Sequence, residues 1–254
     1  MGVTYNNRIV TDGIVFCCDF ASKKTYSGSG TEWFELTTGV SGVVGNEPTY
    51  NNDHLSFDGT DDYILTQVKG VADTGGYDGL TRDVAYYYPK MRSQFTVDFV
   101  CRPYDTITIK SEGNSGYPGT TGQKYIFGTP FNAENMNSSN AVPCISIGTN
   151  AIQIFGHGPV YMPCYLSYQA SLSAINYYSI RFSGSAINLF INSVNVRNTT
   201  QVNRTLTCNI SNIGHGNGYY DGVNADFYLA RLYDRALTND EIRRNYLSTK
   251  ERYL

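Results

Sequence analysis

Charged side chains are scarce in this sequence. Asp, Glu, Lys and Arg together make up 16% of the 254 residues, well below the ~25% that is usual for soluble proteins. The balance of charge is slightly acidic, with a formal net charge of −3 and a pI near 5.6. A protein that binds nucleic acid needs a positively charged surface that neutralises phosphates. The sequence therefore predicts no nucleic-acid partner.

Long apolar runs are also missing. No stretch of the sequence approaches the ~20 apolar residues that span a bilayer. The opening residues, MGVTYNNRIV, lack the basic start and apolar run of a signal peptide. Asn6 stands where the myristoylation pattern requires Ser or Thr. We therefore expect no membrane partner, no signal peptide and synthesis in the cytoplasm.

Paired metal-binding cysteines are absent as well. The sequence has six cysteines and three histidines but no CxxC and no His-rich spacing, which argues against a structural zinc site. Cys17 and Cys18 are adjacent and would point to opposite faces of a strand. We interpret the cysteines as small buried side chains of a reduced compartment. Three disulfides are the alternative.

Aromatic residues and glycine are plentiful. Tyr (22), Phe (12) and Gly (25) favour strands and tight turns, and the sequence predicts an all-β fold. Short β-type runs bounded by Gly, Asn, Asp or Pro recur along the chain. The predicted strands are Ile14–Phe20, Leu55–Phe57, Tyr63–Leu65, Phe95–Arg102, Thr106–Lys110, Tyr125–Phe127, Pro143–Ile147 and Ile152–Phe155.

The strand patterns indicate a sandwich. Phe95, Val97 and Phe99 alternate with more polar neighbours, which predicts a half-buried strand with one wet face. Residues 178–182 and 186–191 form a predicted hairpin, which Asn192 and Ser193 extend into a three-stranded meander. The last strand, residues 227–233, carries apolar residues on both sides and should be buried on much of both faces.

One helix is predicted, at the C-terminus. Thr238 and Glu241 have the spacing of a capping box, and Leu237 and Ile242 form the matching hydrophobic staple. Acidic residues precede basic ones along the segment, as the helix dipole favours. We expect a short helix that docks through Ile242 and Tyr246.

Four segments resemble the concanavalin A-like jelly rolls of the laminin G and pentraxin type, in the variant found in bacteriophage virion proteins. They cover nearly the whole chain in the family's order. The resemblance implies two antiparallel sheets face to face, the first and last strands side by side, and one jelly-roll domain over residues 1–254. The segments are Ile9–Phe16 with Ser27–Leu36, Leu55–Ile64, Ile180–Asn192, and Ile213–Gly214 with Asp226–Ile242.

The same resemblance bears on metal binding. Family members often bind calcium through an Asp in the last strand, and Tyr228 holds that position here. Asp58, Asp61 and Asp62 could still gather oxygens around a hard cation. An Asp-Gly-Thr-Asp-Asp run is also a routine turn former whose carboxylates accept backbone N–H groups. We therefore predict no cofactor, with calcium as the open alternative.

Catalytic motifs are not apparent. Glycosidases of this fold place carboxylates at alternate positions of one strand, whereas Glu32 and Glu35 are three residues apart and are expected to be exposed. The sequence has no Gly-x-Ser-x-Gly elbow, HExxH motif or phosphate-binding loop. It therefore predicts a protein that is not an enzyme.

Tyrosines in long, turn-rich segments are the remaining functional signal. Exposed tyrosines stack on sugars or anchor protein interfaces. Long segments without secondary structure are often contact surfaces, and here they cover residues 67–92, 111–123 and 129–142. The candidate contact residues are Tyr86, Tyr87, Tyr88, Tyr219 and Tyr220.

These observations lead to a functional hypothesis with two alternatives. The first is a virion structural protein of a bacteriophage: a capsid decoration, head fibre or tail-associated component that contacts other virion proteins or its own copies in an oligomer or lattice. The second is a lectin-like adhesion module that binds host surface glycans. The third is an endoglycanase. The fold alone does not choose among them, because jelly rolls serve all three roles.

Overall fold

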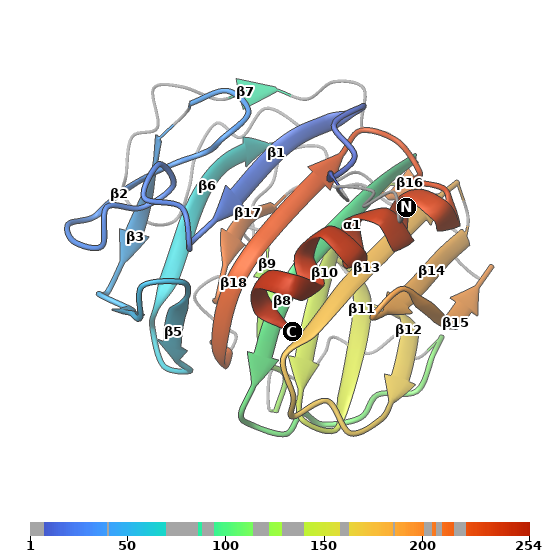
Figure 1. The fold of residues 1–254 in the computed structure, drawn as a ribbon. Helices are drawn as coiled ribbons and strands as arrows, with labels where there is room; N and C mark the ends of the chain where they lie inside the picture. Colours follow the sequence, from blue (N-terminus) through green and yellow to red (C-terminus); the bar gives the residue numbers. More distant parts are fainter. Residues whose placement is uncertain are drawn as a thin grey trace.

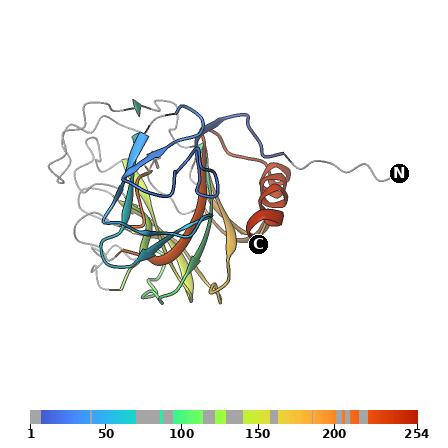
Figure 2. The ribbon, with the colours of Figure 1, turned by 60° about the vertical axis from the view of Figure 1, so that its left-hand side comes forward.

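The computed structural model describes residues 8–39, 41–69, 86–87, 94–113, 122–128, 140–157, 163–184, 186–200, 205–206, 210–215 and 222–254. Their strands form two sheets packed face to face, with one helix on the outer side of the first sheet (Figures 1 and 2). Except for two short parallel pairings, the strands run antiparallel. The predicted all-β jelly-roll sandwich with a short C-terminal helix is thus confirmed.

The first sheet has eight strands. Its order begins with β15 (Val194–Thr199), β14 (Ala186–Ile191), β13 (Asn176–Ser183) and β8 (Gln94–Pro103), and continues with β18 (Asn224–Tyr233), β5 (Leu55–Asp58) and β4 (Thr49–Tyr50). β1 (Ile14–Asp19) pairs with the second half of β18, so the first and last strands lie side by side as expected. The 178–191 hairpin and its extension into β15 are also confirmed.

The second sheet has ten strands. Eight of them follow the order β12 (Cys164–Gln169), β11 (Ala151–His157), β10 (Asn140–Gly148), β9 (Tyr125–Gly128), β17 (Ile210–Ile213), β6 (Tyr63–Lys69), β3 (Ser41–Gly45) and β2 (Glu32–Phe34). β16 (Thr205–Leu206) lies parallel to β10, and β7 (Tyr86–Tyr87) lies parallel to β6.

One predicted strand is wrong. Residues 106–110 form no strand, because side chains rather than a neighbouring strand satisfy much of their backbone. Asn150 accepts from the Ile107 N–H at 2.9 Å and donates to the Ile107 carbonyl at 2.9 Å. Gln153 does the same for Lys110, at 3.3 and 2.7 Å.

The main core fills the space between the sheets. Phe99 of the first sheet meets Phe127 of the second with ring centroids 5.0 Å apart. Trp33 is buried against Phe16 and Phe20 and donates its Nε1–H to the Leu65 carbonyl at 3.1 Å. A Cβ on Gly42 would lie 2.2 Å from Trp33 Nε1, so only glycine lets the tryptophan lie flat beneath β3.

The outer face of β8 differs from the prediction. Thr96 and Asp98, expected on a wet face, are both fully buried, because the helix α1 (Asn239–Tyr253) lies across β18, β8 and β13 (Figure 1). Burial raises the pKa of Asp98. The alternation of apolar and polar residues along β8 was predicted correctly, but it could not reveal that a helix covers the outer face of the strand.

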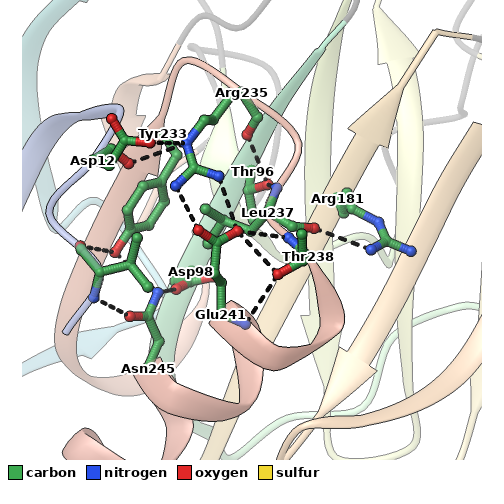
Figure 3. A network of polar contacts seen from close by, with 11 residues as sticks. Asp12, Thr96, Asp98, Arg181, Tyr233, Arg235, Leu237, Thr238, Glu241 and Asn245 are labelled. Carbon is green, nitrogen blue, oxygen red and sulfur yellow. Dashed lines mark hydrogen bonds and ion pairs between the residues drawn. The ribbon is translucent and has the colours of Figure 1, made fainter. Parts of the chain in front are cut away.

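Polar side chains attach this helix to the sheet (Figure 3). Asn245 of α1 is fully buried. It donates to Asp98 Oδ2 at 2.8 Å and to the Tyr233 hydroxyl at 2.9 Å, and it accepts from the Val10 N–H at 2.8 Å. Thr249, the other buried polar residue of α1, accepts from the Arg231 guanidinium at 3.2 Å. The predicted docking through Ile242 is confirmed, with Tyr246 partly buried.

The predicted capping box forms at the helix start. The Glu241 N–H donates to the Thr238 hydroxyl at 3.3 Å, and the Glu241 carboxylate accepts from the Thr238 N–H at 2.8 Å. Arg235 adds two hydrogen bonds to the same carboxylate, at 2.9 and 2.7 Å, as Figure 3 shows.

The cysteines within the described residues are buried, as predicted: Cys17, Cys18, Cys101, Cys144 and Cys164. No helix within the described ranges is long and apolar enough to cross a bilayer.

Candidate functional site

The outer face of the first sheet is covered only in part. β5 and the beginning of β18 lie beyond the C-terminal end of α1 (Figure 1). A cross-strand row of polar residues lies there, in which Ser56 of β5 pairs with Asp226 of β18 and Asp226 pairs with Arg102 of β8. Alternation along a strand sends these side chains to the outer face. We call this region the Asp226 site; it consists of Asp53, His54, Ser56, Arg102, Tyr104, Asp226 and Tyr228.

Asp226 is the centre of the site. Its Oδ1 accepts from the Ser56 hydroxyl at 2.6 Å, and its Oδ2 accepts from the Tyr104 hydroxyl at 2.5 Å. Asp226 itself is only 8% exposed, whereas Tyr104 is 45% exposed. A buried carboxylate therefore fixes the orientation of a tyrosine whose side chain is open to solvent.

His54 joins two carboxylates of the site. Its Nδ1 lies 2.6 Å from Asp53 Oδ1, and its Nε2 lies 3.5 Å from Asp226 Oδ1. Its ring packs against Tyr228 with centroids 4.7 Å apart, and Tyr228 in turn contacts Tyr253 at the end of α1. These aromatic rings form the border between the site and the helix.

Local backbone features place these side chains. A turn closes the β4–β5 hairpin with a hydrogen bond from the Asn51 N–H to the His54 carbonyl, and Asn52 adopts a φ of 70° there, which asparagine tolerates better than most residues. A bulge between Phe227 and Leu229 interrupts the pairing of β18 with β8. The extra residue, Tyr228, packs in the outer cluster with Leu229, while Phe227 packs in the main core.

The charges of the site act on its tyrosines. Burial, together with the negative charges of Asp226 and Asp53, raises the pKa of Tyr228 to about 12. Burial also raises the pKa of Tyr104, helped by its hydrogen bond to Asp226. Both phenols are thus neutral hydroxyls at physiological pH. The Arg102 guanidinium lies 5.2 Å from the centroid of the Tyr104 ring, a distance typical of a cation–π contact.

The predicted acidic turn lies next to this site. Single carboxylate oxygens of Asp58, Asp61 and Asp62 lie within 4.8 Å of one another. Two of these carboxylates cap the turn: Asp62 accepts from the Asp58 N–H at 2.9 Å, and Asp58 accepts from the Thr60 N–H at 2.7 Å. Calcium takes six to eight oxygens, and two of the six carboxylate oxygens here are already engaged with backbone N–H groups. At the family position, Tyr228 packs between His54 and Tyr253 and offers no carboxylate. This geometry fits the turn interpretation better than a calcium site.

The predicted tyrosine contacts fall mostly outside the described residues. Tyr86 and Tyr87 form β7, which pairs in parallel with Val68 and Lys69 at the end of β6. These two residues are therefore in a short strand and not in an unstructured loop as predicted. Tyr88, Tyr219 and Tyr220 lie outside the described residues. The role of all five as contact residues stays a prediction.

The expectation for Glu35 is wrong. Glu35 is only 4% exposed, whereas Glu32 is exposed. The Glu35 carboxylate accepts from the backbone N–H groups of Cys17, Thr37 and Thr38 at 2.6, 2.7 and 2.6 Å. It is a buried structural anion that joins β1 to the segment after β2.

Sequence reasoning missed the Asp226 site. Ser56 and Asp226 are 170 positions apart, so only the pairing of β5 with β18 brings them together. The available signal was the alternation in Leu55–Asp58, which places Ser56 and Asp58 on the face opposite Leu55 and Phe57. Combined with the acidic residue Asp226 near the beginning of the largely apolar last strand, it indicated a polar patch.

Comparison with known proteins places the fold but not the family. No protein-family model and no curated protein matches the sequence. Among solved structures, the chain is similar to a Trypanosoma rangeli sialidase in complex with sialic acid, with 18% identity, a TM-score of 0.58, and coverage of 95% of this chain and 34% of the sialidase. A single-residue mutant of HCR/D matches with 11% identity, a TM-score of 0.57, and coverage of 95% and 52%.

These neighbours contradict the prediction that the protein is not an enzyme. The solved chains that share its fold include sialidases and a T. rangeli sialidase mutant displaying trans-sialidase activity, which matches with 18% identity, a TM-score of 0.58, and coverage of 94% and 33%. The lack of a motif in the sequence was therefore no sound basis for that prediction. The chain spans about a third of the length of the sialidase chains it matches. At such identities the likeness shows the fold alone and assigns no activity.

Proposed function

We propose that this domain binds carbohydrate through the Asp226 site and works as an adhesion module. One observation carries the proposal: the half-exposed Tyr104, which directly follows β8, is held by a buried carboxylate at the uncovered part of the first sheet. Aromatic side chains offer sugars a flat apolar face with a polar tip. Binding sites built on strands hold their geometry better than sites on loops.

The remaining groups of the site suit a hydroxyl-rich ligand. Ser56, Asp226 and Asp53 present oxygens, and Arg102 and His54 present nitrogens, all around Tyr104. A few polar groups placed beside an aromatic surface are the usual composition of a small-molecule site. The sialidase of known structure with this fold is in complex with a sugar, sialic acid, which supports a sugar ligand at the level of fold and does not bear on which sugars the Asp226 site prefers.

A glycan array tests the proposal. The wild-type domain should retain a subset of glycans, and Tyr104→Ala should weaken that retention by about tenfold or more, because truncating an aromatic anchor of a binding site costs about 2 kcal/mol or more. Phe34→Ala is the matched control. Phe34 is 43% exposed, close to the 45% of Tyr104, but it lies on β2 of the other sheet. Equal losses in the two variants, or no retention by the wild type, would contradict glycan binding at this site.

We also propose that the domain works in a bacteriophage particle, where a glycan-binding component would serve attachment to the host. The support is the resemblance of four segments to phage virion jelly rolls, including Ile9–Phe16 and Asp226–Ile242. Other virion proteins or further copies of the chain would then be its partners. Tyr86–Tyr88 and Tyr219–Tyr220 remain the candidate contacts.

A protein inventory of purified particles tests this setting. Mass spectrometry should find the chain in stoichiometric amounts in the particle, and particles depleted of it should adsorb to host cells more slowly. If the chain is absent from purified particles, the proposed location is wrong, while glycan binding would stand.

A further inference from the structure

We propose that the Asp226 site selects sugars without acidic groups: it accepts neutral, hydroxyl-rich residues and rejects carboxylated or sulfated ones. The inference rests on the proposed glycan binding and specifies its ligand class. Two independent features of the site carry it, namely the direction of its hydrogen bonds and its charge.

The hydrogen bonds inside the site determine what a ligand must offer. Ser56 and Tyr104 each have one hydroxyl proton, and both protons are donated to Asp226. The hydroxyl oxygens can then only accept from a ligand. The carboxylates of Asp226 and Asp53 can also only accept while ionised. Sugar hydroxyls can donate to these oxygens, whereas a carboxylate or sulfate group cannot.

The negative charge of the site also disfavours acidic ligand groups. Asp53 and Asp226 flank His54 within the site, and Asp58 follows two positions after Ser56 on the same face of β5. The side chain of Asp53 is 50% exposed, so its charge faces the solvent from which a ligand arrives. An anionic ligand group here would meet like charges at short range, where repulsion near a protein surface is substantial.

The basic side chains near the site already have contacts within the protein. Arg102 donates from Nε to the Ser173 carbonyl at 3.2 Å and lies over the Tyr104 ring. Arg252, near the end of α1, pairs with Asp19 at 2.7 Å. His54 is held between Asp53 and Asp226. The Asp226 site thus holds one arginine, Arg102, against the two carboxylates of Asp53 and Asp226, and this balance disfavours an acidic sugar.

The test compares matched glycan pairs. Each neutral oligosaccharide is presented beside the same oligosaccharide extended with sialic acid, and beside its sulfated form. We expect the wild-type domain to bind the neutral member about tenfold or more tightly, which corresponds to about 1.4 kcal/mol. Near 1 M salt the preference should shrink, because the Debye length falls to about 3 Å.

Two variants test the cause of the preference. Asp226→Asn removes the charge in nearly the same shape and releases the Ser56 and Tyr104 protons from a charged acceptor, so acidic glycans should gain relative to neutral ones. Asp53→Asn should shift the ratio of acidic to neutral glycan binding in the same direction. Because the Asp53 side chain is half exposed, this change should not disturb folding. Glu32→Gln, an exposed acid on β2, is the control and should leave the ratio unchanged.

The outcomes separate the inference from the function beneath it. Equal or tighter binding of the acidic members, with sensitivity to Tyr104→Ala, would overturn the selectivity and leave glycan binding intact. If that binding were lost in Arg102→Gln, the guanidinium would be the group that captures the acid. If no glycan is retained by the wild type, both proposals fail.

Discussion

Glu35 shows how much a single buried charge can contribute in this fold. Its carboxylate accepts three backbone N–H groups and the Thr38 hydroxyl, all between 2.6 and 2.7 Å. Hydrogen bonds to ionised acceptors are about twice as strong as neutral ones. Without the carboxylate, the Cys17 N–H would be left buried and unsatisfied.

We therefore predict that Glu35→Ala lowers the free energy of unfolding by about 2–4 kcal/mol, as measured by urea denaturation. Glu32→Ala is the control, because Glu32 is exposed three residues earlier, and it should change the value by no more than about 0.5 kcal/mol. If Glu35→Ala lowers the free energy of unfolding as little as the control does, water has replaced the carboxylate as the acceptor for these N–H groups.

For single residues, the burial of a side chain was harder to predict from the sequence than the strand or turn that contains it. Glu35 and Asp98 were both expected at exposed positions and are both buried. The local pattern was no guide, since each is buried by a partner distant in sequence: Glu35 by β1 and Asp98 by α1. The same limit applies to the Asp226 site, where no single segment contains more than part of the cluster.

The start of α1 makes the stability of the protein depend on pH. Two hydrogen bonds from Arg235, together with those from Thr238, hold the pKa of Glu241 at about 2, below its ordinary value of 4.5. A carboxyl whose pKa is depressed in the folded state stabilises the fold above its unfolded-state pKa. This contribution is lost as the pH falls from about 4.5 through 2.

Glu241→Gln should therefore lower the free energy of unfolding by about 1 kcal/mol at pH 7. The difference from the wild type should narrow as the pH falls below 4.5 and approach zero near pH 2, in denaturation curves recorded across that range. Asp240→Asn, in the same helical turn but outside the Arg235 pair, is the control. A difference that is independent of pH would assign the loss to helix propensity instead of charge.

The docking of α1 depends on the contact between Asn245 and Asp98. Asn245→Ala should cost about 2–4 kcal/mol, because it removes a donor from a fully buried carboxylate. In an Asp98→Asn background the same change should cost less, with a coupling of about 1 kcal/mol or more in a double-mutant cycle. Ser248→Ala, which loses only a bond to the Asn245 carbonyl, should not couple to Asp98. If the free-energy costs of Asn245→Ala and Asp98→Asn simply add, the two side chains do not interact directly.

Strands and helices could be predicted from the sequence where a local motif was strong. The capping box at Thr238 and Glu241 and the hairpin of residues 178–191 were predicted with their partners. The strands β12 and β17 were missed, because one begins with Cys164 and Tyr165 and the other has polar residues at Ser211 and Asn212. Neighbouring strands, rather than their own sequence, make these segments extended.

Across the whole molecule, the order of the segments was sufficient to predict a two-sheet sandwich, and the structure confirms it. The function was not predictable in the same way, since solved chains that share the fold include sialidases and HCR/D. A fold constrains where a site can be, whereas the chemistry of the site depends on its side chains.

The cysteines provide a measure of how cooperatively this sandwich unfolds. Cys17 and Cys18 lie in β1, Cys101 in β8, Cys144 in β10 and Cys164 in β12, so the buried cysteines sample both sheets. Burial raises the pKa of Cys17 to about 11 and that of Cys164 to about 12. The thiolate is the reactive form, and it is suppressed in the folded state by burial and by the raised pKa together.

Alkylation of these cysteines should therefore require unfolding. With iodoacetamide at pH 8, peptide mass spectrometry should find all of them modified far more slowly in the native protein than in urea, and at one common rate if the two sheets open together. Raising the pH to 9 should accelerate labelling of the unfolded chain. Native labelling should stay far slower than that, because only the small open population reacts. Fast native labelling of Cys17 and Cys18 alone would show that β1 detaches from β18 while the rest stays folded. The face that carries the Asp226 site would then be mobile, because Phe20, which follows β1, donates its N–H to the Tyr228 carbonyl.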